Sequence, residues 1–224
     1  MVVSAVDGHC LWAPVYDSAP NPLLAVERRT VIRLLSTTVP ARVVDVACGT
    51  GRWMLHFNQA GAKVLGVDAC PEMLAQAGKH HALRGRLILG DAQDLALANE
   101  VADLIVCSFA SAYIRDVSRL MGELARIAVP GGRVIVSDMH CLAAAAGWRR
   151  SFKSGASLYE LQHFDHSPGR IRQAGKAHSL CFDGESDAYF DEDDRSIFER
   201  AGKQHLYSQL RTVPAVWVGI WTKP

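Results

Sequence analysis

The sequence predicts an α/β fold, in which an open and mostly parallel sheet binds a nucleotide-like ligand at the carboxyl ends of its strands. One observation is that residues 42–46 are apolar and β-branched apart from Asp45, and that a glycine turn and a helical pattern follow them. A second is that Asp68 and Asp91 stand at the ends of later apolar runs. A third is that four more apolar runs alternate with helical patterns, at 63–68, 86–90, 102–108 and 133–140. Buried parallel strands have such nearly continuous apolar runs.

Composition and charge are those of one globular domain. The chain has 224 residues and a net charge of +1, so it can bury a sizeable core, and neither nucleic acid nor a membrane is an expected partner. No basic stretch followed by a long apolar run opens the chain, and no run is long enough to span a bilayer, so neither a signal peptide nor a transmembrane segment is expected. The six cysteines form no Cys-x-x-Cys pair, which favours reduced thiols in a cytoplasmic protein over a disulfide framework or a zinc site.

Residues 1–40 are expected to form an irregular N-terminal cap followed by a helix. Asn21 is a suitable N-cap, and Pro22 is a suitable first helical residue because its missing N–H has no helical partner to lose. Pro40 is expected to end the helix. Tyr16 precedes the helix, and from the residues alone its interpretation is a surface turn.

The glycine turn after residue 46 indicates which ligand is bound. Glycines permit positive φ angles and a close approach of the backbone to a ligand, and the helix start adds unpaired N–H groups. A dinucleotide fingerprint would need a third glycine where Met54 stands, and it does not include an acid at Asp45 inside the strand. The segment Asp45-Val-Ala-Cys-Gly-Thr-Gly51 instead resembles the glycine loop of class I S-adenosylmethionine (SAM)-dependent methyltransferases. Among them it is similar to the small-molecule type that methylates ubiquinone and menaquinone precursors.

This resemblance implies a Rossmann-like sheet of seven strands, mostly parallel with an antiparallel last strand, and helices on both faces. It also implies SAM as the cofactor. Asp45 would then hold the ammonium of the methionine part, and the loop backbone would hold its carboxylate, because these groups match in charge and hydrogen bonding. The expected cofactor-binding residues are Tyr16, Asp45, Ala47, Gly49, Thr50, Gly51, Asp68, Ala69, Met73, Asp91, Ala92, Ser108 and Phe109.

Three of these residues keep an alternative interpretation. Asp68 lies 17 residues after Gly51, where an acid at the end of the second strand can accept hydrogen bonds from both ribose hydroxyls; otherwise it caps the helix that begins near Pro71. The resemblance places Asp91 beside the adenine amine, whereas it could also be a turn residue. Met73 could touch the adenine, although a methionine at helical spacing is more often part of the core.

The residues after the fourth and fifth strands should face the reaction, because ligands of open α/β sheets lie at the carboxyl ends of the strands. Tyr113 and His140 are the catalytic candidates there. Histidine titrates near neutral pH and is the usual general base, but His140 could equally be a structural residue that hydrogen-bonds to the backbone. His163 and His166 could join it at a metal, but the tight ligand spacing of such a site is absent, so no metal is expected.

The resemblance returns in the second half of the chain and then weakens. The helical pattern over 117–128, the turn Pro130-Gly131-Gly132 and the strand after it match the same family. From 141 to 190 this pattern is lost, and two strand-like runs around Ser167-Pro168-Gly169 predict a lid hairpin. The resemblance implies that a lid at this position selects the substrate.

The C-terminal part is expected to complete the sheet. A helix over 193–202 should be followed by strands over 205–213 and 215–221. The resemblance implies that these two strands pair antiparallel, with the last one beside the fifth strand. One domain therefore spans 1–224. Its expected parts are a cap and helix (1–40), a SAM-binding core (41–140), a substrate lid insertion (141–190) and a final helix with strands (191–224).

The predicted function is methyl transfer from SAM to an N or O atom of a small-molecule acceptor, with secondary metabolism as one setting. A SAM-binding protein without methyl transfer, acting as a regulator or as a scaffold for another reaction, is the alternative. An NAD-dependent oxidoreductase is disfavoured by Met54 and Asp45. The expected partner is the small-molecule acceptor, and a homodimer is left open.

Overall fold

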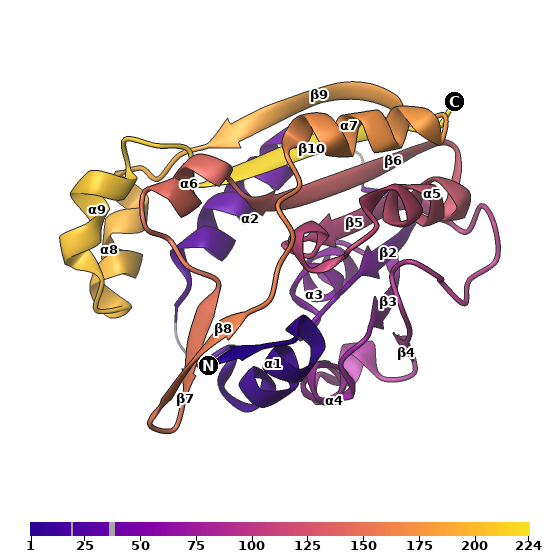
Figure 1. Cartoon of the computed structure of the whole chain (residues 1–224). Coiled ribbons are helices and arrows are strands. Elements are labelled where there is room, and N and C mark those ends of the chain that lie inside the picture. Colours follow the sequence, from indigo (N-terminus) through magenta and orange to yellow (C-terminus); the bar gives the residue numbers. More distant parts are fainter. Residues whose placement is uncertain (19, 36–38) are drawn as a thin grey trace.

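The computed structural model describes residues 1–18, 20–35 and 39–224, so Ala19 and residues 36–38 lie outside the described part. Within these ranges the largest sheet has seven strands in the order β4-β3-β2-β5-β6-β10-β9 (Figure 1). The first five in this order run parallel, and β10 runs antiparallel to both β6 and β9. This topology confirms the predicted α/β fold. The strands are β2 (Arg42–Val46), β3 (Lys63–Asp68), β4 (Leu87–Leu89), β5 (Ala102–Ser108), β6 (Ala128–Met139), β9 (Cys181–Ala188) and β10 (Val216–Thr222).

The strand that carries the glycine loop, β2, lies inside the sheet between β3 and β5. Its residue Val44 pairs with Leu65 on one side and with Ile105 on the other. Val43 and Val44 are both buried but belong to different core clusters, because successive side chains of a strand point to opposite faces. Burial on both faces explains the apolar run that predicted this strand. The buried Asp45 within that run is therefore unusual.

Helices cover both faces of the sheet (Figure 1). Trp53 and Phe57 of α3 pack on the Val43 face together with side chains of α2, α8 and α9. Leu120 and Leu124 of α5 pack on the opposite face together with α7. The helices around the sheet are α2 (Pro22–Leu34), α3 (Arg52–Gln59), α4 (Pro71–Ala77), α5 (Val117–Ile127), α7 (Pro168–Ala177), α8 (Glu192–Arg200) and α9 (Gln204–Leu210).

The N-terminal segment is more regular than the sequence suggested. It forms the short strand β1 (Val2–Val3) and the helix α1 (Ala5–Trp12), followed by the 3₁₀ turn η1 (Ala13–Val15). β1 joins the hairpin of β7 (Ser151–Ser154) and β8 (Ser157–Leu161) in a separate three-stranded sheet. α1 contacts both this hairpin and α4, as Figure 1 shows. Two segments far apart in sequence therefore form one added layer.

The expectation of a hairpin around Ser167-Pro168-Gly169 is wrong. Ser167 instead caps α7, where its side chain accepts a hydrogen bond from the N–H of Arg170, and Pro168 is the first helical residue. Serine followed by proline suits a helix start as well as a turn, so the local signal was ambiguous. The insertion after β6 consists of α6 (Cys141–Ala145), β7 and β8, and it is shorter than the predicted 141–190.

The predicted strand over 205–213 is also wrong, because α9 occupies most of that segment. The strand that pairs with β10 is β9, which precedes α8. β9 lies at the edge of the sheet and most of its side chains are exposed, so its sequence is largely polar and lacks the apolar run of the central strands. The final strand β10 does lie beside β6, as predicted.

An ion pair fixes α2 against the start of α8. Asp194 is fully buried, and its two carboxylate oxygens accept hydrogen bonds from the Arg29 guanidinium at 3.1 and 2.9 Å. Asp194 also accepts from the N–H of Asp191 as half of a capping box.

In the described part of the chain, no helix is long and apolar enough to cross a membrane.

We expect Asp194→Asn to lower the free energy of unfolding by about 2 kcal/mol, because Arg29 loses a charged partner and α8 loses half of its capping box. Denaturant unfolding measures this change. Asp193→Asn is the matched control, since it removes the same charge from the exposed neighbouring position and should change stability by less than about 0.5 kcal/mol. Equal losses in the two variants would contradict a structural role for the ion pair.

Candidate active site

One cavity of 580 Å³ lies at the carboxyl ends of β2, β3, β4, β5 and β6, and the cap and the insertion after β6 complete its walls. This volume is in the range of small-molecule sites, which run from about 300 to about 1,000 Å³. A cavity of suitable size therefore lies at the sheet edge where the sequence predicted a ligand site. Eleven of the expected residues line it: Tyr16, Ala47, Gly49, Asp68, Ala69, Met73, Asp91, Ala92, Ser108, Phe109 and Tyr113.

The glycine loop presents its backbone to this cavity. Gly51 has a φ of +86° as the N-cap of α3, and a Cβ there would lie 2.5 Å from Leu83 Cδ1, so only glycine fits. Gly49, at φ +53°, has open space where a Cβ would stand. Ala47 and Phe109 also have positive φ angles, of 58° and 54°. Strained residues at two neighbouring strand ends are typical of ligand sites.

Asp68 joins three segments at the end of β3. Its Oδ2 accepts a hydrogen bond from the N–H of Gly49 at 2.7 Å, and its Oδ1 accepts one from the N–H of Cys70 at 2.8 Å. Burial raises the pKa of Asp68, against the effect of these hydrogen bonds. The carboxylate thus supports the start of α4, although the N-cap itself is Cys70, and it also lines the cavity. Each oxygen keeps lone-pair capacity for a ligand hydroxyl.

A second, smaller cavity of 60 Å³ adjoins the loop, and it contains the two expected residues Asp45 and Thr50. The Thr50 hydroxyl donates to Asp17 at 3.3 Å. Burial raises the pKa of Asp45 from an ordinary value of 3.8 to about 8, although the nearby Arg52 guanidinium opposes this shift. Asp45 therefore keeps its proton at neutral pH in the ligand-free protein.

Sequence reasoning missed Glu27, a fully buried acid in α2. Its Oε1 accepts hydrogen bonds from the hydroxyls of Ser108 and Ser137, at 2.9 and 2.8 Å, and from the Trp53 indole at 3.3 Å. Its Oε2 accepts from Arg52 Nη2 at 2.9 Å. The carboxylate therefore fixes the ends of β5 and β6 relative to α3. The only feature of the sequence that could have indicated Glu27 was its position on the buried side of α2.

His9 of α1 is a second residue that the sequence analysis missed, and it lines the large cavity together with Tyr113. The two rings are in T-shaped contact, with centroids 5.0 Å apart. His9 Nδ1 lies 2.7 Å from the Ala5 carbonyl, which can only accept, so Nδ1 carries the proton and Nε2 is left as an acceptor. Burial lowers the pKa of His9, which favours this neutral form, and burial raises the pKa of Tyr113.

The three histidines proposed from the sequence do not converge. His140 is the N-cap of α6: its Nδ1 accepts from the N–H of Leu142 at 3.1 Å, and its Nε2 lies 3.6 Å from an Asp187 oxygen. It lines neither cavity, so the structure does not support the expectation that it faces the acceptor. A histidine directly before a helix can serve as its cap, which is the structural alternative considered for it. His163 and His166 each lie within hydrogen-bonding distance of a backbone carbonyl.

A buried ion pair lies at the β6 end of the cavity. Arg150 Nη2 donates to Asp138 Oδ1 at 2.8 Å, while Asp138 Oδ2 accepts from the Ser111 hydroxyl at 2.6 Å and from the N–H of Ala112 at 2.8 Å. Burial alone would raise the pKa of Asp138, but Arg150 and these hydrogen bonds lower it overall. The pair therefore holds the loop that carries Tyr113 against the insertion.

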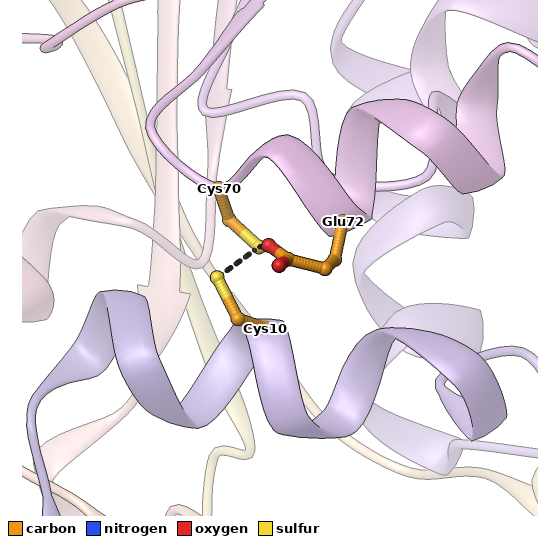
Figure 2. A group of neighbouring side chains, drawn as sticks. All are labelled: Cys10, Cys70 and Glu72. Carbon is orange, nitrogen blue, oxygen red and sulfur yellow. Dashed lines mark hydrogen bonds between the residues drawn. The ribbon is translucent and has the colours of Figure 1, made fainter.

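A pair of thiols fixes the cap to α4 (Figure 2). The Sγ atoms of Cys10 and Cys70 lie 2.8 Å apart, and a Glu72 oxygen lies 3.5 Å from Cys70 Sγ. The two Sγ atoms are within hydrogen-bonding distance, and either thiol can be the donor. Burial raises the pKa of both thiols. The three side chains also offer ligand atoms that a metal ion could use. The two cysteines lie 60 positions apart, so spacing along the chain could not predict their contact.

Comparison with known proteins agrees with this geometry. Residues 44–136 match a family model described as a methyltransferase domain, and this range includes the glycine loop, Asp68 and Asp91. Demethylmenaquinone methyltransferase of Thermus thermophilus is 35% identical over 136 residues, which are 56% of this chain and 61% of that protein. Malonyl-[acyl-carrier protein] O-methyltransferase of Pectobacterium atrosepticum is 33% identical over 130 residues, 55% of this chain and 51% of that protein. The chain thus spans between half and two thirds of the length of these relatives.

The similarity in structure extends further than the similarity in sequence. A SAM-dependent methyltransferase of Mesorhizobium loti superposes with a TM-score of 0.68, covering 90% of this chain and all of that one, at 19% identity. At this identity the likeness establishes the fold alone. The matched family range ends within β6, so the cap, the insertion and the C-terminal helices lie outside it.

The buried carboxyl of Asp45 makes stability depend on pH. Its pKa is about 8 in the fold, chiefly because of burial, but about 3.9 in an unfolded chain. Between these values the unfolded chain releases a proton that the folded protein retains, so the free energy of unfolding falls as pH rises. We expect a decline from about pH 5 to about pH 8, of at most about 1.4 kcal/mol per pH unit from this group. Urea unfolding of the wild type and of Asp45→Asn isolates the effect. If the free energy of unfolding depends on pH in the same way in both proteins, Asp45 is not the cause of the decline.

Proposed function

We propose that the chain transfers a methyl group from SAM to an N or O atom of a small-molecule acceptor, because residues 44–136 match a family model described as a methyltransferase domain. One observation carries this proposal. A single cavity joins Gly49, Asp68 and Asp91 to a wall built by the cap and the insertion, where an acceptor can lie beside the cofactor. The name of one relative, an O-methyltransferase, supports an oxygen acceptor. A small-molecule acceptor, a cytoplasmic location and a homodimer remain predictions.

The arrangement of the cavity supports a defined placement of SAM. The small cavity with Asp45, Thr50 and the loop N–H groups would take the methionine part. Asp68 would accept from the ribose hydroxyls, and Asp91 with the neighbouring Ala92 would meet the adenine. Met73 is buried against Ala13 and also lines the cavity, so its core role and an adenine contact are compatible. Ser108, Phe109 and Tyr16 would surround the reacting end.

The transfer itself needs little from the protein beyond positioning. SAM supplies a methyl group on a positively charged sulfur, and that charge is lost in the displacement, so no oxyanion hole is required. Holding the acceptor atom in line with the methyl group can contribute about 7–11 kcal/mol. Tyr16, Phe109 and Tyr113 line the cavity, and their ring faces can stabilise a positive charge nearby.

An acceptor with an O–H or N–H group must also lose a proton. His9 is placed for this step, because its Nδ1 is fixed by the Ala5 carbonyl and its Nε2 is free to accept within the cavity wall. A depressed pKa keeps the imidazole neutral and able to take a proton at neutral pH. His9 therefore replaces His140 as the proposed base, with Tyr113 in contact beside it.

The alternative function is a SAM-binding protein that does not transfer the methyl group. Such a protein would have the same cofactor site as a methyltransferase and would differ from it only in the outcome of the reaction. Incubation of the protein with methyl-labelled SAM and a pool of metabolites separates the two, since a transferase produces a labelled metabolite with one added methyl group. Labelled SAM that stays unchanged over the whole pool would favour the alternative.

We expect SAM and S-adenosylhomocysteine to bind with micromolar affinity, about −8 kcal/mol, in calorimetry, and NAD not to bind. Asp68→Asn should weaken binding at least tenfold, because hydrogen bonds to a charged group contribute about 1.5–3 kcal/mol each. Asp94→Asn, at an exposed position outside the cavity, is the control and should bind normally. Thermal unfolding of the ligand-free variants shows whether Asp68→Asn keeps its fold. If the Asp68→Asn protein folds and binds SAM with unchanged affinity, the role of Asp68 is limited to its hydrogen bonds with the backbone.

With the acceptor identified by the labelled pool, His9→Gln should lower kcat by about 10²–10⁴-fold and leave the affinity for S-adenosylhomocysteine unchanged. The ionisation of the base should also disappear from the pH profile of kcat/KM. His140→Gln is the matched control, since His140 caps α6 away from the cavity. Loss of turnover in His140→Gln but not in His9→Gln would reverse this assignment.

A further inference from the structure

The charges in the cavity wall are separated along the sheet edge. Asp68 and Asp91 follow β3 and β4, at one end of the strand order. Arg149 and Arg150 lie between α6 and β7, in the insertion that follows β6, and Lys203 lies between α8 and α9. β2 and β5 stand between the two groups, and Figure 1 shows α8 and α9 on the side away from α4. Acids therefore line the end proposed for the nucleoside, and bases line the other end.

The three basic side chains are only partly neutralised by the protein. Arg150 donates to Asp138, which gives it one negative partner. Arg149 Nη1 donates to the backbone carbonyls of Ala144 and Trp148, which carry no net charge. The Lys203 ammonium lies 5.1 Å from the centroid of the Trp148 ring. No carboxylate pairs with Arg149 or Lys203 among the described residues, so this end of the cavity has an excess of positive charge.

The surroundings of these bases fit a ligand that is more than a free ion. The Trp12 and Trp148 rings line the same cavity, as do Val15 and Leu24. Apolar walls with a few charged groups at one end suit a molecule with an apolar body and one charged group. The planar guanidinium of arginine can donate two parallel hydrogen bonds to two oxygens of a carboxylate or of a phosphate.

We propose that the methyl acceptor carries a carboxylate or a phosphate, and that this anion binds beside Arg149, Arg150 and Lys203 at the β6 end of the cavity. This inference rests on the proposed methyl transfer and names the chemical class of its substrate. The anion would hold the acceptor by one end, while its nucleophilic atom faces the sheet centre near His9 and Tyr113. The cofactor's own carboxylate is the competing occupant, but the glycine loop that would hold it lies on β2, toward the acidic end.

The test uses the full chain saturated with S-adenosylhomocysteine. Calorimetry measures the binding of two anionic probes, benzoate and phenyl phosphate, and of their neutral counterparts benzamide and benzyl alcohol. We expect each anion to bind at least tenfold more tightly than its neutral counterpart. Raising the salt from about 50 to about 500 mM should weaken binding of the anions only, because it screens exposed charges. The tighter of the two anions indicates which class the site prefers.

Variants assign the preference to the basic residues. Arg149→Gln and Lys203→Gln should each weaken anion binding about three- to tenfold, and leave the affinities for benzyl alcohol and S-adenosylhomocysteine unchanged. Arg150 is not substituted, because Asp138 would lose its buried partner. Arg195→Gln is the control with the same charge change on exposed α8, outside the cavity, and should bind the anions normally.

Equal binding of anionic and neutral probes would overturn the proposal. So would unchanged anion binding in both variants, or an equal loss in the Arg195→Gln control. Loss of S-adenosylhomocysteine affinity in the Arg149 or Lys203 variant would also overturn it, by assigning these bases to the cofactor carboxylate. Wild-type protein that binds no S-adenosylhomocysteine would instead contradict the proposed function itself, so the two failures are distinguishable.

Discussion

The carboxylate of Asp68 is the constraint on which the rest of the site depends. It accepts one backbone N–H from the glycine loop and one from the start of α4, so a single side chain fixes both segments relative to the end of β3. Cys70 receives one of these hydrogen bonds and also touches Cys10 of α1. The position of the cap, and of His9 within it, therefore follows from the same carboxylate. Its burial carries a cost, seen in its raised pKa, that its two N–H partners offset only in part.

The site is built from two kinds of structure. The half proposed for the cofactor comes from the carboxyl ends of β2, β3 and β4 and the loops that follow them, in the parallel part of the sheet. The half proposed for the acceptor comes from α1, from the insertion after β6 and from the segment between α8 and α9. These parts lie outside the range that matches the family model. Substrate choice can therefore differ among relatives that share the same cofactor half.

The sequence predicted the parts of the fold that depend on local patterns. The strand at 42–46, the glycine turn and Asp68 could be found because buried parallel strands are apolar and because turn geometry requires glycine at Gly51. β9 was missed because an edge strand has exposed polar side chains, and α9 was mistaken for a strand. Neither β9 nor α9 could be identified without knowing which segments become neighbours in the fold.

The residues of the candidate site also divide into those that local patterns predicted and those that they did not. Residues directly after central strands were found, because the carboxyl ends of parallel strands meet at one edge. His9 and Glu27 were missed, since each enters the site from a helix packed against strands that are distant in sequence. His140 was misassigned because proximity along the chain to the end of β6 does not determine where a side chain points; helix capping turned it away.

A crystal structure of the complex with S-adenosylhomocysteine would show whether the cavity at the strand ends binds SAM through the glycine loop and Asp68. We expect the ribose hydroxyls within hydrogen-bonding distance of Asp68, the adenine beside Asp91, and the amino-acid end against the loop near Asp45. Clear density for the ligand at any other place, with Asp68 contacting only Gly49 and Cys70, would contradict this expectation.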